Sequence, residues 1–415
     1  MMIKKRTVFL LGAGAASDWH NAPSTKDLTT FIRNIGPKKG ERYIIDYIFE
    51  KFNRNISGLD SLNFEGLIDI LEQCIQYWSA NGKTPTINNL LLKREDEFWD
   101  NIIDYEYVEK SSQTRLNNSI RRSDLNQQAK FFVFLLASIY QGINSEIAKY
   151  GQFNSNTSKI DSPENTEINR LAKDYFTNLS KDNYLRIYSL NYDRVVQYLF
   201  HKAGLPAFQG FDSEDLTPKN YNDKNLVDSK RILTSFDENC IYHLHGNYAW
   251  DIMENNLLNI PDEIVNSYWG RVANNRPFSL MFMEKNKPLL QSNIISGFSK
   301  VQRTNLKPFK QMSSAFDIDC HMANEIIIIG YSFGDTHINE TIRQAKSANP
   351  TCKITCISPK EDTKGELLKN ILWNIRQGSN NDFVEGHHTK SSESYNCTIH
   401  FQKWREYLET HLKEC

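Results

Sequence analysis

The sequence has no long apolar run and almost no net charge. No stretch of its 415 residues approaches the ~18 consecutive apolar residues of a membrane-spanning helix, and residues 1–6 lead into a strand-like run instead of a secretory signal. The 49 lysines and arginines nearly balance the 50 aspartates and glutamates, which leaves no global attraction toward nucleic acid or an anionic membrane. We therefore expect a cytoplasmic protein with no membrane partner and no direct nucleic-acid binding.

Cysteines are few, and none forms the closely spaced pairs that hold zinc. The seven cysteines are scattered, odd in number and free of any Cys-x-x-Cys motif, whereas disulfide frameworks use even numbers and structural zinc sites use four ligands. Cys352 and Cys356 lie four residues apart but lack the two further ligands that zinc requires, so we interpret them as buried packing residues. The sequence predicts no bound metal.

Part of the dinucleotide fingerprint of dehydrogenases is also missing. An apolar run at residues 8–11 leads into Gly12, Ala13 and Gly14, but Ser17 stands where a third glycine would be. No strand ending in an acidic residue follows about 20 residues later, which disfavours hydride transfer. The glycine turn alone allows two interpretations: a backbone cradle for a phosphate, or a tight connection without a ligand.

Four polar segments each follow a strand-like apolar run. The runs span residues 8–11, 185–188, 240–242 and 326–329, and the segments after them are residues 12–17, 189–193, 243–246 and 330–335. Such runs are typical of parallel strands buried on both faces, and open α/β sheets bind ligands at the carboxyl ends of their strands. We therefore predict an α/β fold with a Rossmann-like parallel sheet that gathers these segments at one edge. A fifth strand, residues 353–357, ends at Ser358.

The second and third segments each allow a functional and a structural interpretation. Asn191 and Asp193 would project to the same side of a strand end and address one ligand, or they would cap a helix at residues 194–200. His243 and His245 would share one face of the third strand. A histidine beside a glycine has an open approach to a ligand, whereas a lone histidine is more often a packed polar residue. The residues alone leave these alternatives open.

The chain is longer than one core usually supports, and its middle part has a helical pattern. A single core stops growing at about 250–300 residues, so a second lobe or a large insertion is expected. Apolar residues recur at three-to-four spacing in residues 43–52, 64–78, 131–150 and 168–179. We predict a discontinuous Rossmann domain (1–35 and 181–362), a helical insertion (36–180) and a C-terminal helical segment (363–415) with helices at 364–376 and 401–413.

In their order along the chain, these motifs resemble those of the sirtuin superfamily of NAD-consuming enzymes, over residues 1–35 and about 181–362. In that family a glycine-rich turn holds the pyrophosphate of NAD, a Gly-x-Ser element grips the ribose and phosphates, and a later strand end lies near the adenosine. The resemblance implies that these roles fall on Gly12, Ala13, Gly14 and Ser17, on Gly330 and Ser332, and on Ser358, respectively.

The same resemblance implies which residues form the reaction centre. The Asn-x-Asp strand end places a catalytic asparagine at Asn191 and an aspartate that contacts the nicotinamide amide at Asp193. The His-Gly pair places the catalytic histidine at His245, which could act as general base toward water or a ribose hydroxyl. With water as the nucleophile, NAD+ is cleaved to ADP-ribose and nicotinamide.

The sequence is also similar to sirtuin-like domains of bacterial anti-phage defence proteins. Those domains have a large helical insertion, a Gly-Tyr-Ser-Phe-Gly-Asp stretch like residues 330–335 followed by His-Ile-Asn, and a run like residues 294–297 with Lys300. The similarity implies an NAD+ hydrolase that acts in abortive infection as a homo-oligomer, with a HerA-type hexameric ATPase as a candidate partner.

Two other function classes stay open. An NAD-dependent protein deacylase or ADP-ribosyltransferase is disfavoured because the paired Cys-x-x-Cys zinc module of deacylase sirtuins is missing and no acyl-lysine groove is recognisable. A non-catalytic sensor of NAD or of ADP-ribose-type nucleotides would need the binding residues alone. The presence of Asn191, Asp193 and His245 together favours an enzyme.

Overall fold

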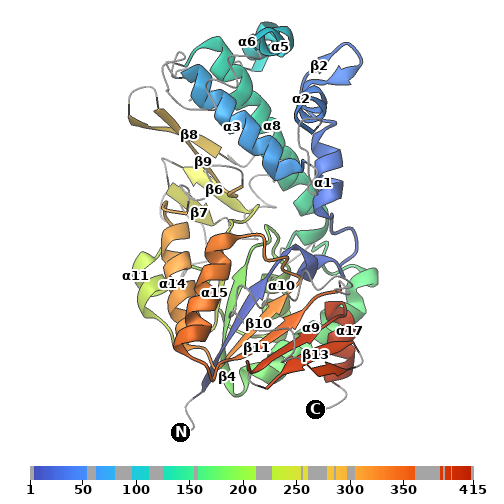
Figure 1. Cartoon of the computed structure of the whole chain (residues 1–415), viewed down its shortest axis with the longest axis vertical. Coiled ribbons are helices and arrows are strands. Elements are labelled where there is room, and N and C mark those ends of the chain that lie inside the picture. The colour runs from blue at the N-terminus through green and yellow to red at the C-terminus, as the bar shows by residue number, and fades with distance from the viewer. Residues whose placement is uncertain are drawn as a thin grey trace. The chain divides into compact units, whose positions relative to one another are not determined.

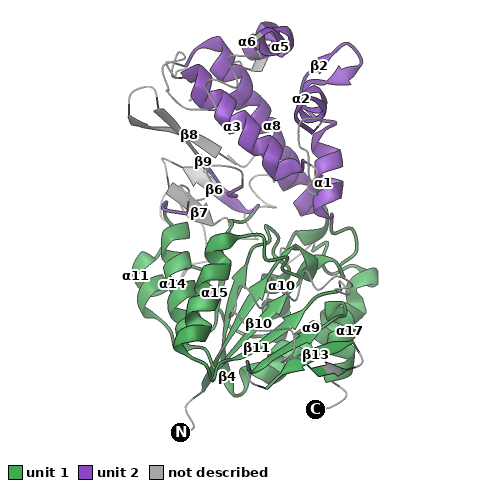
Figure 2. Cartoon of the chain, in the orientation of Figure 1, with its two compact units in different colours: residues 1–22, 149–247, 307–415 green, residues 23–148, 248–306 purple. Residues whose placement is uncertain are grey.

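The computed structural model divides into two compact units (Figure 2). The first unit comprises residues 1–22, 149–247 and 307–415, and the second comprises residues 23–148 and 248–306. The described residues are 4–53, 62–79, 96–111, 125–153, 158–211, 227–253, 256–259, 278–284, 287–296, 304–359, 384–386, 388–393 and 395–412.

The unit boundaries differ from those expected for an insertion at residues 36–180. Helix α9 (Thr166–Ser180) falls in the first unit because it packs on strand β4 (Asn183–Ser189). Residues 248–306, expected in the Rossmann domain, fall in the second unit, where strand β9 (Lys287–Ser292) contacts helix α3 (Phe64–Ser79). These long-range contacts are not visible in local sequence patterns.

The first unit is built on a mixed, mostly parallel sheet of eight strands within the described residues (Figure 1). The pairs from β14 to β5 are all parallel, whereas β12–β13 and β13–β14 are antiparallel. The spatial order is β12 (Val384–Gly386), β13 (Thr389–Ser392), β14 (Cys397–His400), β11 (Lys353–Ile357), β10 (Glu325–Ile329), β1 (Lys5–Leu11), β4 and β5 (Cys240–His243). The predicted Rossmann-like α/β fold is confirmed.

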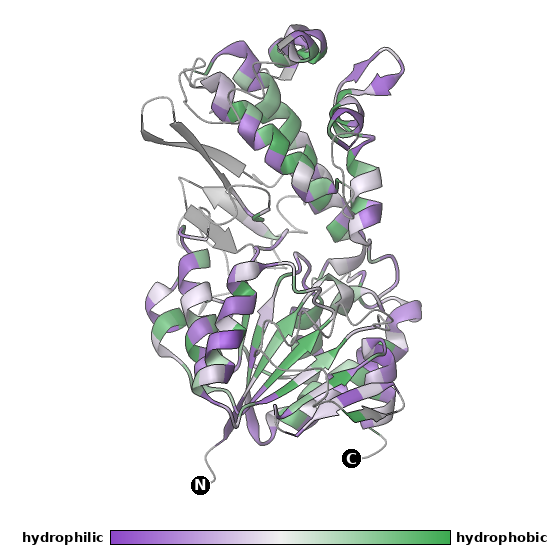
Figure 3. Cartoon of the chain, in the orientation of Figure 1, coloured by the Kyte–Doolittle hydropathy of each residue, from purple (hydrophilic) through white to green (hydrophobic). Residues whose placement is uncertain are grey.

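Helices cover both faces of this sheet (Figure 1). Helices α9, α10 (Val195–Ala203) and α17 (Trp404–His411) form one layer, and α11 (Ser229–Thr234), α14 (Phe309–Met322) and α15 (Thr336–Ala348) form the other. Figure 3 shows the central strands as predominantly hydrophobic. The four isoleucines of β10 are at most 2% exposed, and burying each such side chain stabilises the fold by roughly 1.5–3 kcal/mol.

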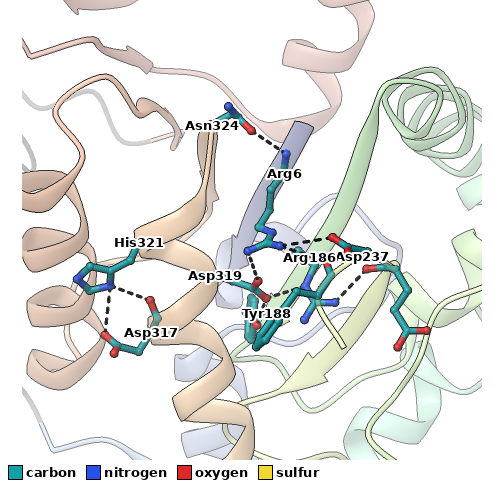
Figure 4. A network of polar contacts seen from close by, with 10 residues as sticks. Arg6, Arg186, Tyr188, Asp237, Asp317, Asp319, His321 and Asn324 are labelled. Atoms are coloured by element: carbon teal, nitrogen blue, oxygen red, sulfur yellow. Dashed lines mark hydrogen bonds and ion pairs between the residues drawn. The ribbon is translucent and has the colours of Figure 1, made fainter. Parts of the chain in front are cut away.

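A buried ion-pair network fixes α14 to the sheet (Figure 4). The Arg186 Nε of β4 donates to the Asp319 Oδ2 of α14 at 2.6 Å, and the Tyr188 hydroxyl donates to the same oxygen at 2.5 Å. Arg6 of β1 brings its guanidinium to 3.4 Å from the other oxygen of Asp319. Because the side chains of Arg186 and Asp319 are fully buried, each charge depends on the other for compensation.

The second unit is largely helical. Its helices are α1 (Thr25–Ile32), α2 (Ile44–Asn53), α3, α5 (Asp96–Ile102), α6 (Tyr105–Ser111) and most of α8 (Gln127–Gly151), and its hairpins are β2–β3 (Lys38–Lys39, Arg42–Tyr43), β6–β7 (Trp250–Met253, Asn256–Asn259) and β8–β9 (Phe278–Glu284, Lys287–Ser292). By length and composition alone, α8 could cross a membrane, but 67% of its most apolar window is buried inside the structure. That burial fits a core helix of a soluble domain.

The C-terminal segment differs from the helical expectation for residues 363–415. The helix predicted at 401–413 is present as α17, whereas strands β12 to β14 were not expected, and the predicted helix at 364–376 lies outside the described residues. Strand β14 has only four residues, of which Cys397 and Ile399 are buried and alternate with half-buried ones. So short an alternation gives a weak strand signal on its own.

Candidate functional site

The motif segments line up along one edge of the sheet. Leu11, the last residue of β1, pairs with Ile329 of β10 on one side and with Ser189 of β4 on the other. Ser189 in turn pairs with His243 of β5, and Ile329 pairs with Ile357 of β11. All five strands therefore end at the same level, and the predicted segments follow directly. The chain crosses from the β4 side of β1 to the β10 side, which makes this edge the ligand-binding position of an open α/β sheet.

Glycines allow the turns after β1 and β10 to contact each other through their backbones. Gly14 N donates to Gly330 O at 2.9 Å, and Gly12 N donates to Ile329 O at 2.9 Å. Gly330 has a φ of +60°, and a Cβ there would lie 2.2 Å from the backbone nitrogen of Ala15. The predicted glycines Gly12, Gly14 and Gly330 thus lie together. Glycine is needed at these positions because two turns of the protein's own backbone approach each other closely.

Hydroxyl and backbone groups face solvent around the contact between the turns after β1 and β10. Ala13, Ser17 and Ser332 are exposed, and Ser358 at the end of β11 is half-buried. The Ser17 hydroxyl donates to Gly14 O at 2.7 Å and keeps its lone pairs for a further contact. Hydroxyls and backbone amides at strand ends suit the phosphate and ribose oxygens of a dinucleotide.

Tyr331 and Asn339 shape the loop after β10. The Tyr331 hydroxyl accepts from Asp335 N at 3.0 Å and lies 3.0 Å from Asn339 Oδ1, and Asn339 Nδ2 donates to Phe333 O at 2.7 Å. These bonds hold the backbone of residues 331–335, including Phe333 at a φ of +58°. The loop therefore presents Ser332 outward from a fixed frame.

The Asp193 carboxylate is engaged by the protein on both oxygens. It is buried; Oδ1 accepts from Val195 N at 3.0 Å, and Oδ2 accepts from the Tyr150 hydroxyl at 2.9 Å. Burial raises the pKa of Asp193, and these two hydrogen bonds partly oppose the shift. Asp193 immediately precedes Arg194, the N-cap residue of helix α10 (Val195–Ala203), and its bond to Val195 N satisfies an amide of the first helical turn.

The two histidines have separate surroundings, because β5 ends at His243 and His245 lies in the turn that follows. The ring of His243 contacts Asn191 O at 2.9 Å, and burial lowers its pKa to about 4. His245 is also buried, but its Nε2 lies 3.8 Å from Asp335 Oδ2, and its ring centre lies 6.5 Å from that of His337. His245 therefore pairs with the loop after β10, whereas His243 contacts the loop after β4.

Asp335 ends the predicted segment 330–335, but the sequence motifs gave it no role. It stands at the N-cap position of α15 with extended backbone angles, yet its side chain makes no capping hydrogen bond. An aspartate at this position ordinarily accepts from the first turn of its helix. Here its carboxylate lies beside His245, a residue 90 positions earlier in the chain, so local spacing could not reveal the pair.

Two further sequence expectations concern a bound metal and the run at residues 294–297. Within the described ranges, no three or more His, Cys, Asp or Glu side chains gather as they would around a metal ion. The run at residues 294–297 with Lys300 extends beyond the described residues, although Ile294, Ile295 and Ser296 are buried.

Comparison with known families fits this architecture. Residues 185–375 match the family model of the SIR2-like domain, and this range contains four of the sheet strands with the segments that follow them. No curated protein matches the sequence. SIR2-like domains use NAD, and the matched range holds Asn191, His245 and the loop after β10. Residues 185–375 of the chain are therefore similar to the SIR2-like domains of the sirtuin-like superfamily.

Proposed function

We propose that this protein is an NAD+ glycohydrolase that cleaves NAD+ to ADP-ribose and nicotinamide. The observation that carries the proposal is His245 at the carboxyl edge of the sheet, with the Asp335 carboxylate 3.8 Å from its Nε2. At this distance the carboxylate can stabilise the imidazolium that forms when His245 accepts the proton from the attacking water. The match to a SIR2-like domain supports NAD as the substrate.

The proposed reaction breaks one bond and forms one bond at the ribose. The bond between C1′ and the nicotinamide nitrogen breaks, and its electron pair neutralises the pyridinium. Water adds to the oxocarbenium-like C1′, and the proton that water loses passes to His245 and then to solvent. No further oxidant or reductant is needed.

The remaining residues receive binding and orienting roles in this proposal. Ser17, Ser332 and Ser358 hold the phosphates and riboses, together with the backbone of the glycine turns after β1 and β10. Asn191 orients the nicotinamide ribose. Asp193, held by Val195 N and by the Tyr150 hydroxyl, supports the Asn191 loop and has one free lone pair on each carboxylate oxygen for the nicotinamide amide.

From the resemblance to anti-phage proteins we also propose a cellular role for this activity. We assign the protein a role in abortive infection, in the cytoplasm, as a homo-oligomer that a HerA-type hexameric ATPase could join. Uncontrolled NAD+ loss would kill the host, so assembly would have to raise the activity. Light scattering combined with an NAD+ assay tests this: a multimer more active than its protomer supports it, and a fully active monomer contradicts it.

Product analysis separates the proposed function from its alternatives. Purified protein is incubated with NAD+, with and without an acetylated peptide, and the products are separated by chromatography. We expect nicotinamide and ADP-ribose in equal amounts, at a rate that does not depend on the peptide. Deacetylated or ADP-ribosylated peptide would instead identify a deacylase or a transferase, and NAD+ binding without turnover would identify a sensor.

A further inference from the structure

A buried histidine lies directly against the backbone of Asn191. His243, the last residue of β5, is 3% exposed, and its Nδ1 lies 2.9 Å from Asn191 O. Its Nε2 lies 3.0 Å from Asn247 Nδ2 and 2.6 Å from Gln197 Nε2. The imidazole thus contacts Asn191 after β4, Asn247 after β5 and Gln197 of α10.

The partners of the ring determine which nitrogen carries the proton. The backbone oxygen of Asp193 can only accept, so the Asn247 Nδ2 at 3.1 Å from it is a donor. The same amide group faces His243 Nε2, which must therefore offer its lone pair. The proton then lies on Nδ1, from which it is donated to Asn191 O. Burial, which lowers the pKa of His243 to about 4, keeps this imidazole neutral near pH 7.

Asn191 is held at its backbone nitrogen as well. Asn191 N donates to the hydroxyl of Ser189 at 3.1 Å, while its oxygen accepts from His243. Two positions further on, the Asp193 carboxylate is bound to Val195 N and to Tyr150. Both polar backbone groups of Asn191 are therefore fixed, and its half-buried side chain extends from a peptide with little freedom to rotate.

We propose that His243 is a positioning residue whose neutral imidazole fixes the peptide at Asn191, so that the Asn191 side chain meets NAD+ in one orientation. This inference rests on the proposed function of the site. If the donor on Nδ1 is lost, the Asn191 carbonyl keeps only the longer contact of 3.4 Å with the Ser189 hydroxyl, and the peptide can turn. Misplacement of an orienting group lowers turnover more than it lowers substrate binding.

Two polar substitutions of similar size test the donor itself. In His243→Asn the amide nitrogen can occupy about the position of Nδ1, whereas in His243→Gln it reaches about the position of Nε2. Both variants lose the same ring packing. Tyr242→Phe is the matched control, because it removes a buried polar atom from the neighbouring residue of β5, and we expect its activity to stay at the wild-type level.

We expect His243→Gln to lower kcat for NAD+ cleavage by about 10- to 100-fold, with KM changed less than about threefold, and His243→Asn to recover most of kcat. Crystal structures of the two variants show the cause independently of turnover: the Asn191 peptide should turn in His243→Gln and keep its orientation in His243→Asn. Equal kcat values together with an unmoved Asn191 in both variants would overturn the inference. If the wild type does not cleave NAD+, the proposed function fails, and the crystal structures still test whether His243 holds Asn191.

Discussion

Single glycines set how closely the turns after β1 and β10 approach. A Cβ on Gly14 would lie 2.9 Å from Gly330 Cα, so Gly14→Val disturbs the protein whether or not a phosphate binds there. Lower NAD+ affinity of that variant would therefore not identify a phosphate contact. The sequence pattern correctly indicates a tight turn, but the partner of these glycines is a second turn more than 300 residues away.

Gly330→Ala is expected to destabilise the fold by roughly 3 kcal/mol, because it combines a strained φ with a backbone clash. Gly204→Ala is the control: Gly204 has a φ of +64°, but nothing lies within 4 Å of the added Cβ, so only the strain of about 1 kcal/mol applies. Urea unfolding of both variants measures the difference. Equal losses would mean that the contact between the two turns adds nothing.

The positions of the candidate site residues could be predicted from the sequence, but their side-chain partners could not. Asn191, Asp193 and His245 were predicted from their places after strands, and the structure puts all three at the carboxyl edge of the sheet. The Tyr150 hydroxyl that binds the Asp193 carboxylate lies 43 positions away in α8. Spacing along a strand gives no information about such a partner.

At the scale of elements, the packing of α14 on the sheet depends on a fully buried ion pair between Asp319 of α14 and Arg186 of β4. Asp319→Asn would leave Arg186 fully buried without its counter-ion, and we expect a loss of about 3–5 kcal/mol in the free energy of unfolding. Glu340→Gln breaks an exposed pair with Arg343 and should change stability barely measurably. Chemical denaturation tests both, and a small loss in Asp319→Asn would show that the buried network contributes little.

Buried strands were the elements most readily predicted. The runs at residues 326–329 and 353–357 match β10 and β11 to within one residue, because both faces of these strands are covered and the apolar signal is continuous. Strands β12 and β13 were missed, since this edge of the sheet is polar and short. The amphipathic helices α2, α3, α8 and α9 were predicted, with ends within about four residues of those observed.

At the scale of the whole molecule, the sheet and the segments that follow its parallel strands belong to one unit that is assembled from three stretches of the chain. The sequence predicted the discontinuity, because strand-like runs appear before and after a long helical region. It did not predict that residues 248–306 would fall in the second unit, where strand β9 contacts helix α3.

The most direct test of the account is the rate of nicotinamide release from NAD+ by the wild type and by His245→Ala. We expect a loss of about 10²- to 10⁴-fold, the range that a general base contributes, with an unchanged melting temperature. His201→Ala, which removes an exposed histidine from α10, should retain the wild-type rate. A His245→Ala protein that releases nicotinamide within twofold of the wild-type rate would contradict the account.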